Sequence, residues 1–242
     1  MSNEMTLLKE GKNKKVFSVP GHDNLVLMEF KDTLTAFNNQ KQSSLVGKGH
    51  VCREITALMF RYLQGRGITN HYVEDVGEKS IKALRLRIIP LEVVVRNVVA
   101  GALARKLGLP QGQKIRRPIV EFYYKDDQLG DPFLNDDQIL MLELLSHPEL
   151  VMVKEKAQQI NAHLQALWRE VGILLVDFKI EFGRDGAGLI VLADEISPDS
   201  CRLWDEVTHE PFDKDRFRND KGGVSEAYQT VLSRLRKRGM PG

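Results

Sequence analysis

The stretch LLVDFKIEFGRDGAGLIVLADEISPD, residues 174–199, is the segment from which the fold prediction starts. Val176 is the first of four apolar residues that alternate there with Asp177, Lys179 and Glu181. Successive side chains of a β-strand point to opposite faces of the sheet. The alternation therefore predicts a strand with one apolar face and one face that carries an acid, a base and an acid.

A second strand is expected directly after the first. A glycine-rich segment follows, and the apolar run 189–193 then ends in Asp194 and Glu195. The two runs predict an antiparallel hairpin in which carboxylates on neighbouring strands flank a lysine. Such a group suits a hard, oxygen-preferring cation and the phosphates that accompany it. The alternative interpretation is an ordinary hairpin with one core face and one solvent-exposed face.

The register of this hairpin depends on where the turn lies, and two positions fit the sequence. A two-residue turn at 185–186, an Asp-Gly pair, places Asp194 opposite Asp177. A turn at 187–188 places Asp194 opposite Glu181 instead. The two registers have the same parity, so both predict Asp194 on the charged face of the sheet.

The composition is that of an ordinary soluble globular protein. The chain has 242 residues, of which 42% are hydrophobic and 28% are charged. Its 35 basic and 33 acidic residues give a formal charge of +2, and this balance argues against a nucleic-acid-binding protein. Two cysteines are too few for a disulfide scaffold. Neither a signal-peptide core nor a membrane-spanning run is evident, so we expect a cytoplasmic protein without a membrane partner.

The remaining sequence mixes strands and helices without a regular βαβ order, which predicts an α+β fold. The polar segment 31–48 has little periodicity and is expected to be a long, mobile loop. A strand-rich lobe at 1–89 and an α+β lobe at 90–242 are expected to form one continuous domain. Strands are predicted at 15–19, 25–30, 81–89, 91–95 and 119–124, and helices at 50–64, 100–107, 135–145, 148–171 and from 225 onward.

Charged residues stand near the ends of several predicted strands and suggest a cleft. Each would by itself be an ordinary surface residue, but together they predict a site for an anionic substrate and a metal-bound polyphosphate. The sequence contains neither GxxxxGK[ST] nor GxGxxG, so a Walker site and a Rossmann fold are not supported. The charged residues concerned are Lys12, Lys14, Arg96, Lys125, Asp126, Asp127, Asp131 and Arg202.

Three longer motifs complete the pattern. They are PLEVVVRN at 90–97, DFKIEFG at 177–183, and DEISPD at 194–199, which RLWD follows at 202–205. With these motifs in this order, the chain resembles the SAICAR synthetase (phosphoribosylaminoimidazole-succinocarboxamide synthase) family from residue 10 to residue 218.

The resemblance implies a two-lobed α+β fold with a kinase-like nucleotide cleft between the lobes. It implies an ATP- and magnesium-dependent ligase of de novo purine biosynthesis. Such a ligase joins 5-amino-1-(5-phosphoribosyl)imidazole-4-carboxylate to L-aspartate and gives the succinocarboxamide, ADP and phosphate. A homodimer is expected from the same resemblance.

The resemblance also assigns roles to residues of this sequence. For the nucleotide it implies Lys12, Lys14, Glu92, Lys125 and Glu181, and for magnesium Glu181 and Asp194, which favours the later hairpin register. Near the reacting groups it implies Lys179, Asp177 and Lys125. For the ribonucleotide it implies Arg96, Arg202, Ala102, Asp131 and Asp199, with the two arginines at the 5′-phosphate. The segment 35–39 is expected to be a mobile loop that closes over the aspartate substrate.

This sequence departs from the family pattern in two places. Ala102 stands where many members have a serine that helps to bind the substrate phosphate. One missing neutral hydrogen bond costs about 1 kcal/mol, so weaker binding rather than lost activity is expected. Cys52 and Arg53 stand where asparagines are usual, at the start of a predicted helix.

Two other classes of function fit the same groups. A small-molecule kinase would use similar lysines and metal ligands, but it would form a stable phosphoester and need no aspartate. A non-catalytic nucleotide-binding module would bind ATP and release no phosphate. The presence of both Glu181 and Asp194 argues against the module.

Overall fold

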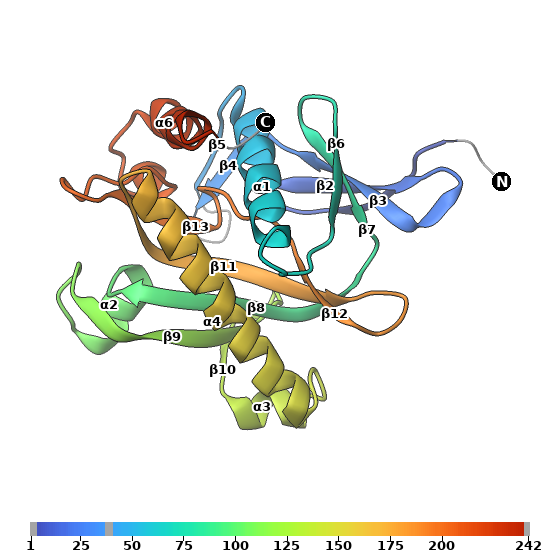
Figure 1. The fold of residues 1–242 in the computed structure, drawn as a ribbon. Coiled ribbons are helices and arrows are strands. Elements are labelled where there is room, and N and C mark those ends of the chain that lie inside the picture. Colours follow the sequence, from blue (N-terminus) through green and yellow to red (C-terminus); the bar gives the residue numbers. More distant parts are fainter. Residues whose placement is uncertain (1–3, 37–40, 240–242) are drawn as a thin grey trace.

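The computed structural model describes residues 4–36 and 41–239 of the chain. Two antiparallel sheets follow one another along the sequence, and helices pack on them (Figure 1). The first sheet has the strand order β1-β2-β3-β7-β6. Its strands are β1 Leu7–Glu10, β2 Lys14–Val19, β3 His22–Phe30, β6 Tyr72–Val76 and β7 Ser80–Leu84.

The second sheet has the order β10-β9-β8-β11-β12, and its central strand β11 carries the charged motif. One edge of β11 pairs with β8, and the other edge is shared by β12 and β13. The strands are β8 Arg87–Val98, β9 Lys114–Tyr124, β10 Phe133–Leu134, β11 Ile173–Arg184, β12 Ile190–Ala193 and β13 Cys201–Asp205.

The helices cover the two sheets around a shared core. Helix α1 packs on the first sheet and against α6, whereas α4 packs on the second sheet. One continuous cluster of buried apolar side chains, with Phe60 and Trp168 among its largest members, extends through both parts. The helices are α1 Lys48–Gln64, α2 Gly101–Leu107, α3 Asp136–Met141, α4 His147–Glu170, α5 Asp215–Arg218 and α6 Val224–Lys237.

The longest helix, α4, illustrates why the helix predictions are confirmed to within a few residues. Its apolar residues recur at helical spacing from Leu150 to Leu167, and that stripe is buried. Ser146 and Glu149 form a capping box at its start. Gly172, with φ 68°, follows its end, where a left-handed residue ends a helix without strain.

Two predicted boundaries are wrong. The expected single strand 81–89 consists of the end of β7 and the start of β8, which belong to different sheets. The expected long loop 31–48 contains a two-stranded sheet, β4 Thr33–Ala36 and β5 Lys41–Ser44. Residues 37–40, which belong to the expected mobile loop, lie outside the described residues. Apolar alternation continues across the first boundary, so sequence periodicity gave no sign of it.

A β-bulge interrupts the apolar face of β11. It lies between Leu175 and Asp177 and shifts the alternation of side chains by one residue. Val176 therefore packs in a small separate cluster with Trp204, whereas Phe178 belongs to the main core. The prediction that Val176 shares a face with Phe178 is wrong for this reason.

The hairpin of β11 and β12 has neither of the two predicted registers. Glu181 pairs with Ala193 rather than with Asp194, one residue away from the later register. The strands are joined by residues 185–189, which is longer than the two-residue turns considered. Asp194 still reaches the charged face, because its φ of 66° turns its side chain away from the strand alternation, and Lys179 Nζ lies 3.1 Å from it.

Candidate active site

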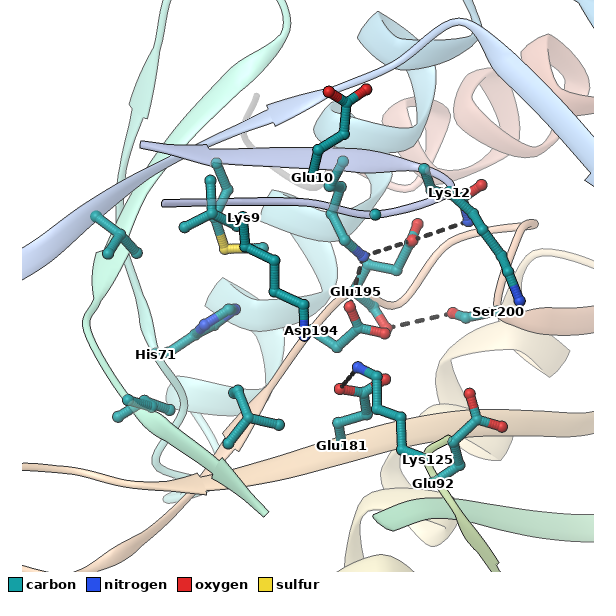
Figure 2. A pocket seen from close by; sticks show the side chains of 18 of the residues that line it. Lys9, Glu10, Lys12, His71, Glu92, Lys125, Glu181, Asp194, Glu195 and Ser200 are labelled. Carbon is teal, nitrogen blue, oxygen red and sulfur yellow. Dashed lines mark hydrogen bonds and ion pairs between the residues drawn. The ribbon is translucent and has the colours of Figure 1, made fainter. Parts of the chain in front are cut away.

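A cavity of about 510 Å³ opens between the two sheets, and its walls differ at the two ends (Figure 2). The first sheet, the β7–β8 connection and the start of β8 supply apolar side chains. The charged side chains come from the β1–β2 region, β8, the β9–β10 connection, β11 and the segment after β12. The apolar lining consists of Leu8, Val16, Val26, Met28, Leu84, Leu86 and Ile88. The charged lining includes Lys12, Lys14, Glu92, Lys125, Asp127, Asp131, Lys179, Glu181, Asp194 and Glu195.

Lys179 stands at the centre of the charged end. Its Nζ lies 2.8 Å from Glu181, 3.1 Å from Asp194 and 3.3 Å from Glu92. Burial opposes its charged form, but the three carboxylates outweigh burial and raise the pKa of Lys179 well above its ordinary value. The predicted Glu92, Lys179, Glu181 and Asp194 are therefore brought together around one ammonium group.

The charged face of β11 is not the solvated face of an ordinary hairpin. Asp177 is 4% exposed and Glu181 is 2% exposed. Ionised groups at such depth need partners, because a buried unpaired charge is strongly disfavoured. Lys125, on the segment after β9, supplies one of these partners through a short contact with Glu181.

Asp194 carries a second ammonium partner from the first sheet. Lys14 Nζ on β2 lies 2.5 Å from Asp194 and 2.6 Å from Glu195. Burial would raise the pKa of Asp194, but Lys14 and Lys179 hold it well below its ordinary value. Lys14 thus ties the first sheet to the segment that follows β12.

Glu195 is a site residue to which the sequence analysis gave no role. Its Oε1 accepts from Lys14 and its Oε2 accepts from Ser197 Oγ at 2.6 Å, and the residue is 2% exposed. Its place directly after Asp194 in an acidic pair was the available signal. Asn13, which also lines the cavity, and His71 lie among polar or apolar neighbours that give no such signal in the sequence.

Lys12 lies at the mouth of the cavity. Its Nζ contacts Asp127 at 2.7 Å, and these two residues come from the β1–β2 and β9–β10 connections. Asp127 is largely exposed, so this ion pair contributes little stability. Lys12 is therefore available to another anion at low cost.

A second charged group surrounds Asp177 at the other part of β11. Its Oδ2 accepts from Arg96 Nη1 at 3.0 Å and from Arg202 Nη1 at 2.7 Å. Glu121 binds Arg96 Nε at 2.6 Å, and Asp215 binds Arg202 Nε at 2.8 Å. The two predicted arginines thus share the carboxylate of Asp177, and each pairs with one further carboxylate, Glu121 for Arg96 and Asp215 for Arg202.

The start of α2 lies against this arginine pair. A Cβ built on Gly101 would lie 2.4 Å from Arg202 Nη2, so the helix start contacts the guanidinium directly. Gly101 has φ 54°, a conformation that glycine adopts without strain. Ala102 follows it in the first turn of α2.

The two remaining predicted substrate residues differ in their surroundings. Asp131 lines the cavity with φ 51°, and its carboxylate accepts from the backbone N–H of Asp126 at 3.1 Å. The side chain of Asp199 is buried, with Lys48 in short contact and the Tyr228 hydroxyl at 2.8 Å. Burial would raise the pKa of Asp199, but its lysine neighbours lower it to about 2.

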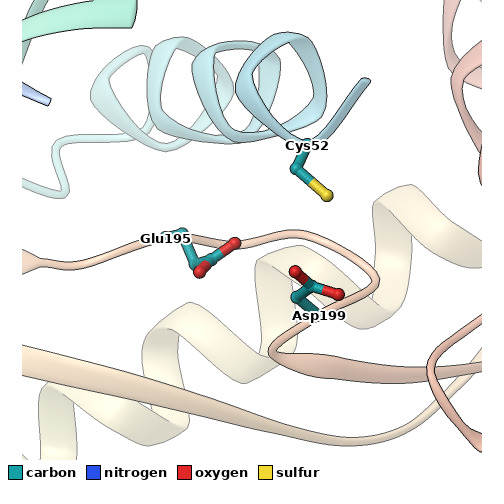
Figure 3. Close-up of side chains that lie close together, drawn as sticks. All are labelled: Cys52, Glu195 and Asp199. Carbon is teal, nitrogen blue, oxygen red and sulfur yellow. The ribbon is translucent and has the colours of Figure 1, made fainter. Parts of the chain in front are cut away.

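In the part of the chain that the structure describes, one group of three possible metal-ligating side chains lies within 4.8 Å: Cys52, Glu195 and Asp199 (Figure 3). Burial, followed by the nearby Asp199, raises the pKa of the Cys52 thiol well above its ordinary value. Lys48 already neutralises Asp199. Within this group, Asp199 is paired with Lys48 and Glu195 with Lys14.

The chain is similar to known proteins over nearly its full length. The SAICAR synthetase family model matches residues 7–235. The chain belongs to the SAICAR synthetase family. A phosphoribosylaminoimidazole-succinocarboxamide synthase of Lysinibacillus sphaericus (strain C3-41) is 49% identical, with 95% of this chain and 97% of that protein covered. The corresponding protein of Bacillus subtilis (strain 168) is 44% identical, with 95% of each covered.

Solved SAICAR synthetase structures share the fold. The Ehrlichia chaffeensis enzyme superposes with a TM-score of 0.94 at 38% identity, over 98% of this chain and all (100%) of that one. A SAICAR synthetase in complex with ADP superposes with a TM-score of 0.91 at 44% identity, over 96% of this chain and 97% of that one. The predicted family, α+β fold class and ligase function are confirmed. Among the described residues, no helix is long and apolar enough to cross a membrane.

Proposed function

We propose that the cavity binds ATP and Mg²⁺ and joins the carboxylate of 5-amino-1-(5-phosphoribosyl)imidazole-4-carboxylate to L-aspartate. The observation that carries the proposal is the division of one cavity into an apolar end and an end with paired lysines and carboxylates. A purine base suits the apolar end, and polyphosphate suits the lysines. The ADP complex of a relative at 44% identity supports nucleotide binding by this chain.

Glu181 and Asp194 fit a magnesium ion. Both are carboxylates, the hard oxygen ligands that Mg²⁺ takes in phosphate sites. Lys179 Nζ lies within 3.1 Å of each of them, so the carboxylates already converge on a positive charge. When bound, the ion neutralises charge on the phosphates as the phosphoryl group is transferred.

The lysines align and neutralise the reacting phosphates. We propose that Lys12 and Lys14 contact the nucleotide phosphates from the first sheet, and that Lys125 and Lys179 approach them from the second. The substrate carboxylate oxygen attacks the γ-phosphorus, ADP leaves, and an acyl phosphate forms on the substrate. The amine of aspartate then attacks the carbonyl carbon, phosphate leaves, and the nitrogen loses a proton. The protein contributes position and charge.

Arg96 and Arg202 are proposed to bind the 5′-phosphate of the ribonucleotide. Planar guanidinium groups bind phosphate oxygens in pairs, and Asp177 holds two such groups side by side. Asp131 and Asp199 are proposed to lie near the imidazole of the substrate. Asp199 is buried, so its proposed role is to hold the segment between β12 and β13 in position. Ala102 offers no side-chain hydroxyl there, so the phosphate depends more on the arginines.

The test follows phosphate release and product formation with ATP, magnesium and the carboxyaminoimidazole ribonucleotide, with and without L-aspartate. We expect both signals to require aspartate. A phosphorylated substrate that accumulates as a stable ester without aspartate would show a kinase. ADP binding with neither signal would show a binding module.

The homodimer and the division into lobes at residues 89–90 are proposed on the family resemblance. The change of sheet between Leu84 and Arg87 supports a division near that point. Sedimentation equilibrium of the full chain measures its oligomeric state, and a monomer at micromolar concentration would contradict the proposed homodimer.

A further inference from the structure

Tyr123 of β9 contacts the arginine pair, and the proposed mechanism gives it no role. Its hydroxyl accepts a hydrogen bond from Arg96 Nη2 at 3.1 Å and donates one to Glu121 Oε2 at 2.8 Å. The same Glu121 oxygen accepts from Arg96 Nε at 2.6 Å. Tyr123, Glu121 and Arg96 are thus joined in a closed triangle of three hydrogen bonds. The tyrosine hydroxyl is both a donor and an acceptor in this triangle.

The pairing of β8 with β9 brings these three side chains together. Arg96 pairs with Ile119 of β9, and Glu121 and Tyr123 follow at intervals of two residues. Residues at that spacing lie on one face of a sheet, so both side chains lie on the face that carries the Arg96 side chain. Tyr124, the next residue of β9, packs against the main core instead.

The aromatic ring of Tyr123 is held in place by two neighbours. Phe133 of β10 packs edge-on against it, with ring centroids 5.8 Å apart. Lys106 of α2 lies over the ring, with its Nζ 5.5 Å from the centroid. The start of the same helix contacts Arg202. Tyr123 is therefore fixed between β10 and α2, and its hydroxyl can hold a neighbouring group in position.

These contacts determine which hydrogen-bond donors of Arg96 remain. A guanidinium has five N–H groups, one on Nε and two on each terminal nitrogen. Glu121 takes the group on Nε, Asp177 takes one on Nη1 at 3.0 Å, and Tyr123 takes one on Nη2. Arg96 makes no further hydrogen bond to the described residues, so one N–H is left on each terminal nitrogen. Two such groups form the fork that binds two phosphate oxygens at once.

We propose that Tyr123 is a positioning residue for the ribonucleotide: together with Glu121 it fixes the Arg96 guanidinium so that its two remaining N–H groups are directed at the 5′-phosphate. This role rests on the phosphate site proposed for Arg96 and names the group that orients it. Without the hydroxyl, Nη2 loses its partner and the guanidinium can rotate toward Glu121. The two donors are then no longer aligned with the phosphate oxygens.

The test is a double-mutant cycle that consists of Tyr123→Phe, which removes only the hydroxyl, Arg96→Lys, and the variant with both changes. Steady-state kinetics gives KM for the ribonucleotide, KM for ATP and kcat. Thermal melts show whether each variant keeps the stability of wild type. Tyr124→Phe is the matched control, because it removes a hydroxyl from the neighbouring residue on the core side of the strand.

Tyr123→Phe is expected to raise KM for the ribonucleotide about fivefold, the size of one hydrogen bond, whereas KM for ATP stays as in wild type. Tyr124→Phe should leave both values unchanged. In the Arg96→Lys background, Tyr123→Phe should change KM for the ribonucleotide less than about twofold, because the fork that it orients is gone.

A fivefold effect that persists in the Arg96→Lys background would overturn the role of Tyr123, because the hydroxyl would then act independently of Arg96. An unchanged KM for the ribonucleotide in Tyr123→Phe, with or without a lower melting temperature, would also overturn it. If Arg96→Lys itself left this KM unchanged, the proposed phosphate site would be wrong.

Discussion

At the scale of single residues, the site consists of carboxylates that are paired with lysines and arginines. Lys14 and Lys179 keep the pKa of Asp194 low despite its burial. Asp177 keeps two guanidinium groups together in the same way. Most of the residues involved were predicted from the sequence, because the motifs that carry them are long and specific. Glu195 was not, since its role arises from a contact between distant segments.

Glu181→Gln and Asp194→Asn are expected to lower kcat by at least about 10²-fold at saturating magnesium, the loss typical when charge stabilisation is removed from a transition state. An amide keeps the size of the side chain but removes the negative charge that a metal ligand needs. Steady-state kinetics at several magnesium concentrations measures the effect. Glu155→Gln, an exposed residue of α4, is the control. Turnover near that of wild type in both variants would contradict the metal assignment.

Arg96→Lys is expected to raise KM for the ribonucleotide by about 10- to 100-fold, while KM for ATP changes little. A lysine keeps the charge but loses the planar fork that binds a carboxylate and a phosphate at once. The matched control is Arg184→Lys at the end of the neighbouring strand β11, where the arginine pairs with Glu149 away from the cavity. Equal changes in both KM values would contradict separate phosphate sites for the two substrates.

At the scale of elements, the sequence predicts which segments are helices and strands better than it predicts the register in which the strands pair. The stripe of α4 and the capping box of α3 were correct, because both are local patterns. The hairpin register was wrong by one residue, because a five-residue connection and a positive φ at Asp194 are not visible in apolar alternation. The bulge before Asp177 was missed for the same reason.

Gly101→Ala tests the contact between α2 and the arginine pair. The new methyl group would meet Arg202 Nη2 at 2.4 Å, so the guanidinium must move. We expect KM for the ribonucleotide to rise by about tenfold or more, consistent with loss of a charge-assisted hydrogen bond. Gly108→Ala at the other end of α2 is a matched control, because Gly108 also has positive φ, 63°, but nothing lies within 4 Å of the added carbon. Similar KM values for the two variants would contradict the contact.

At the scale of the whole molecule, Asp199 links distant parts of the chain. It joins Lys48 at the start of α1 to Tyr228 of α6 and to the segment between β12 and β13. Its pKa is about 2 in the folded protein against an ordinary value of 3.8. Its ionised form therefore stabilises the fold fully above about pH 4, and this contribution is lost as the pH falls toward 2.

Asp199→Asn should lower the free energy of unfolding by about 3–5 kcal/mol at pH 7, because Lys48 is left buried without its counter-charge. The difference from wild type should shrink by about 2 kcal/mol as the pH falls from 4 to 2. Urea unfolding at a series of pH values measures both quantities. The exposed Asp23→Asn serves as the control. A difference that does not depend on pH would contradict the ionic role of Asp199.

The balanced charges of the cavity have a consequence for the order of ligand binding. Lys14 pairs with Asp194 and Glu195, and Lys179 pairs with Asp194 and Glu181. A polyphosphate that arrives alone must draw the ammonium groups away from buried carboxylates, and a divalent cation that arrives alone must displace ammonium groups that have no other anion. When both bind together, the phosphates take the lysines as partners and the cation takes the carboxylates, so neither set of charges is left unpaired. Nucleotide and metal should therefore bind with positive cooperativity, each strengthening the affinity for the other by the same factor.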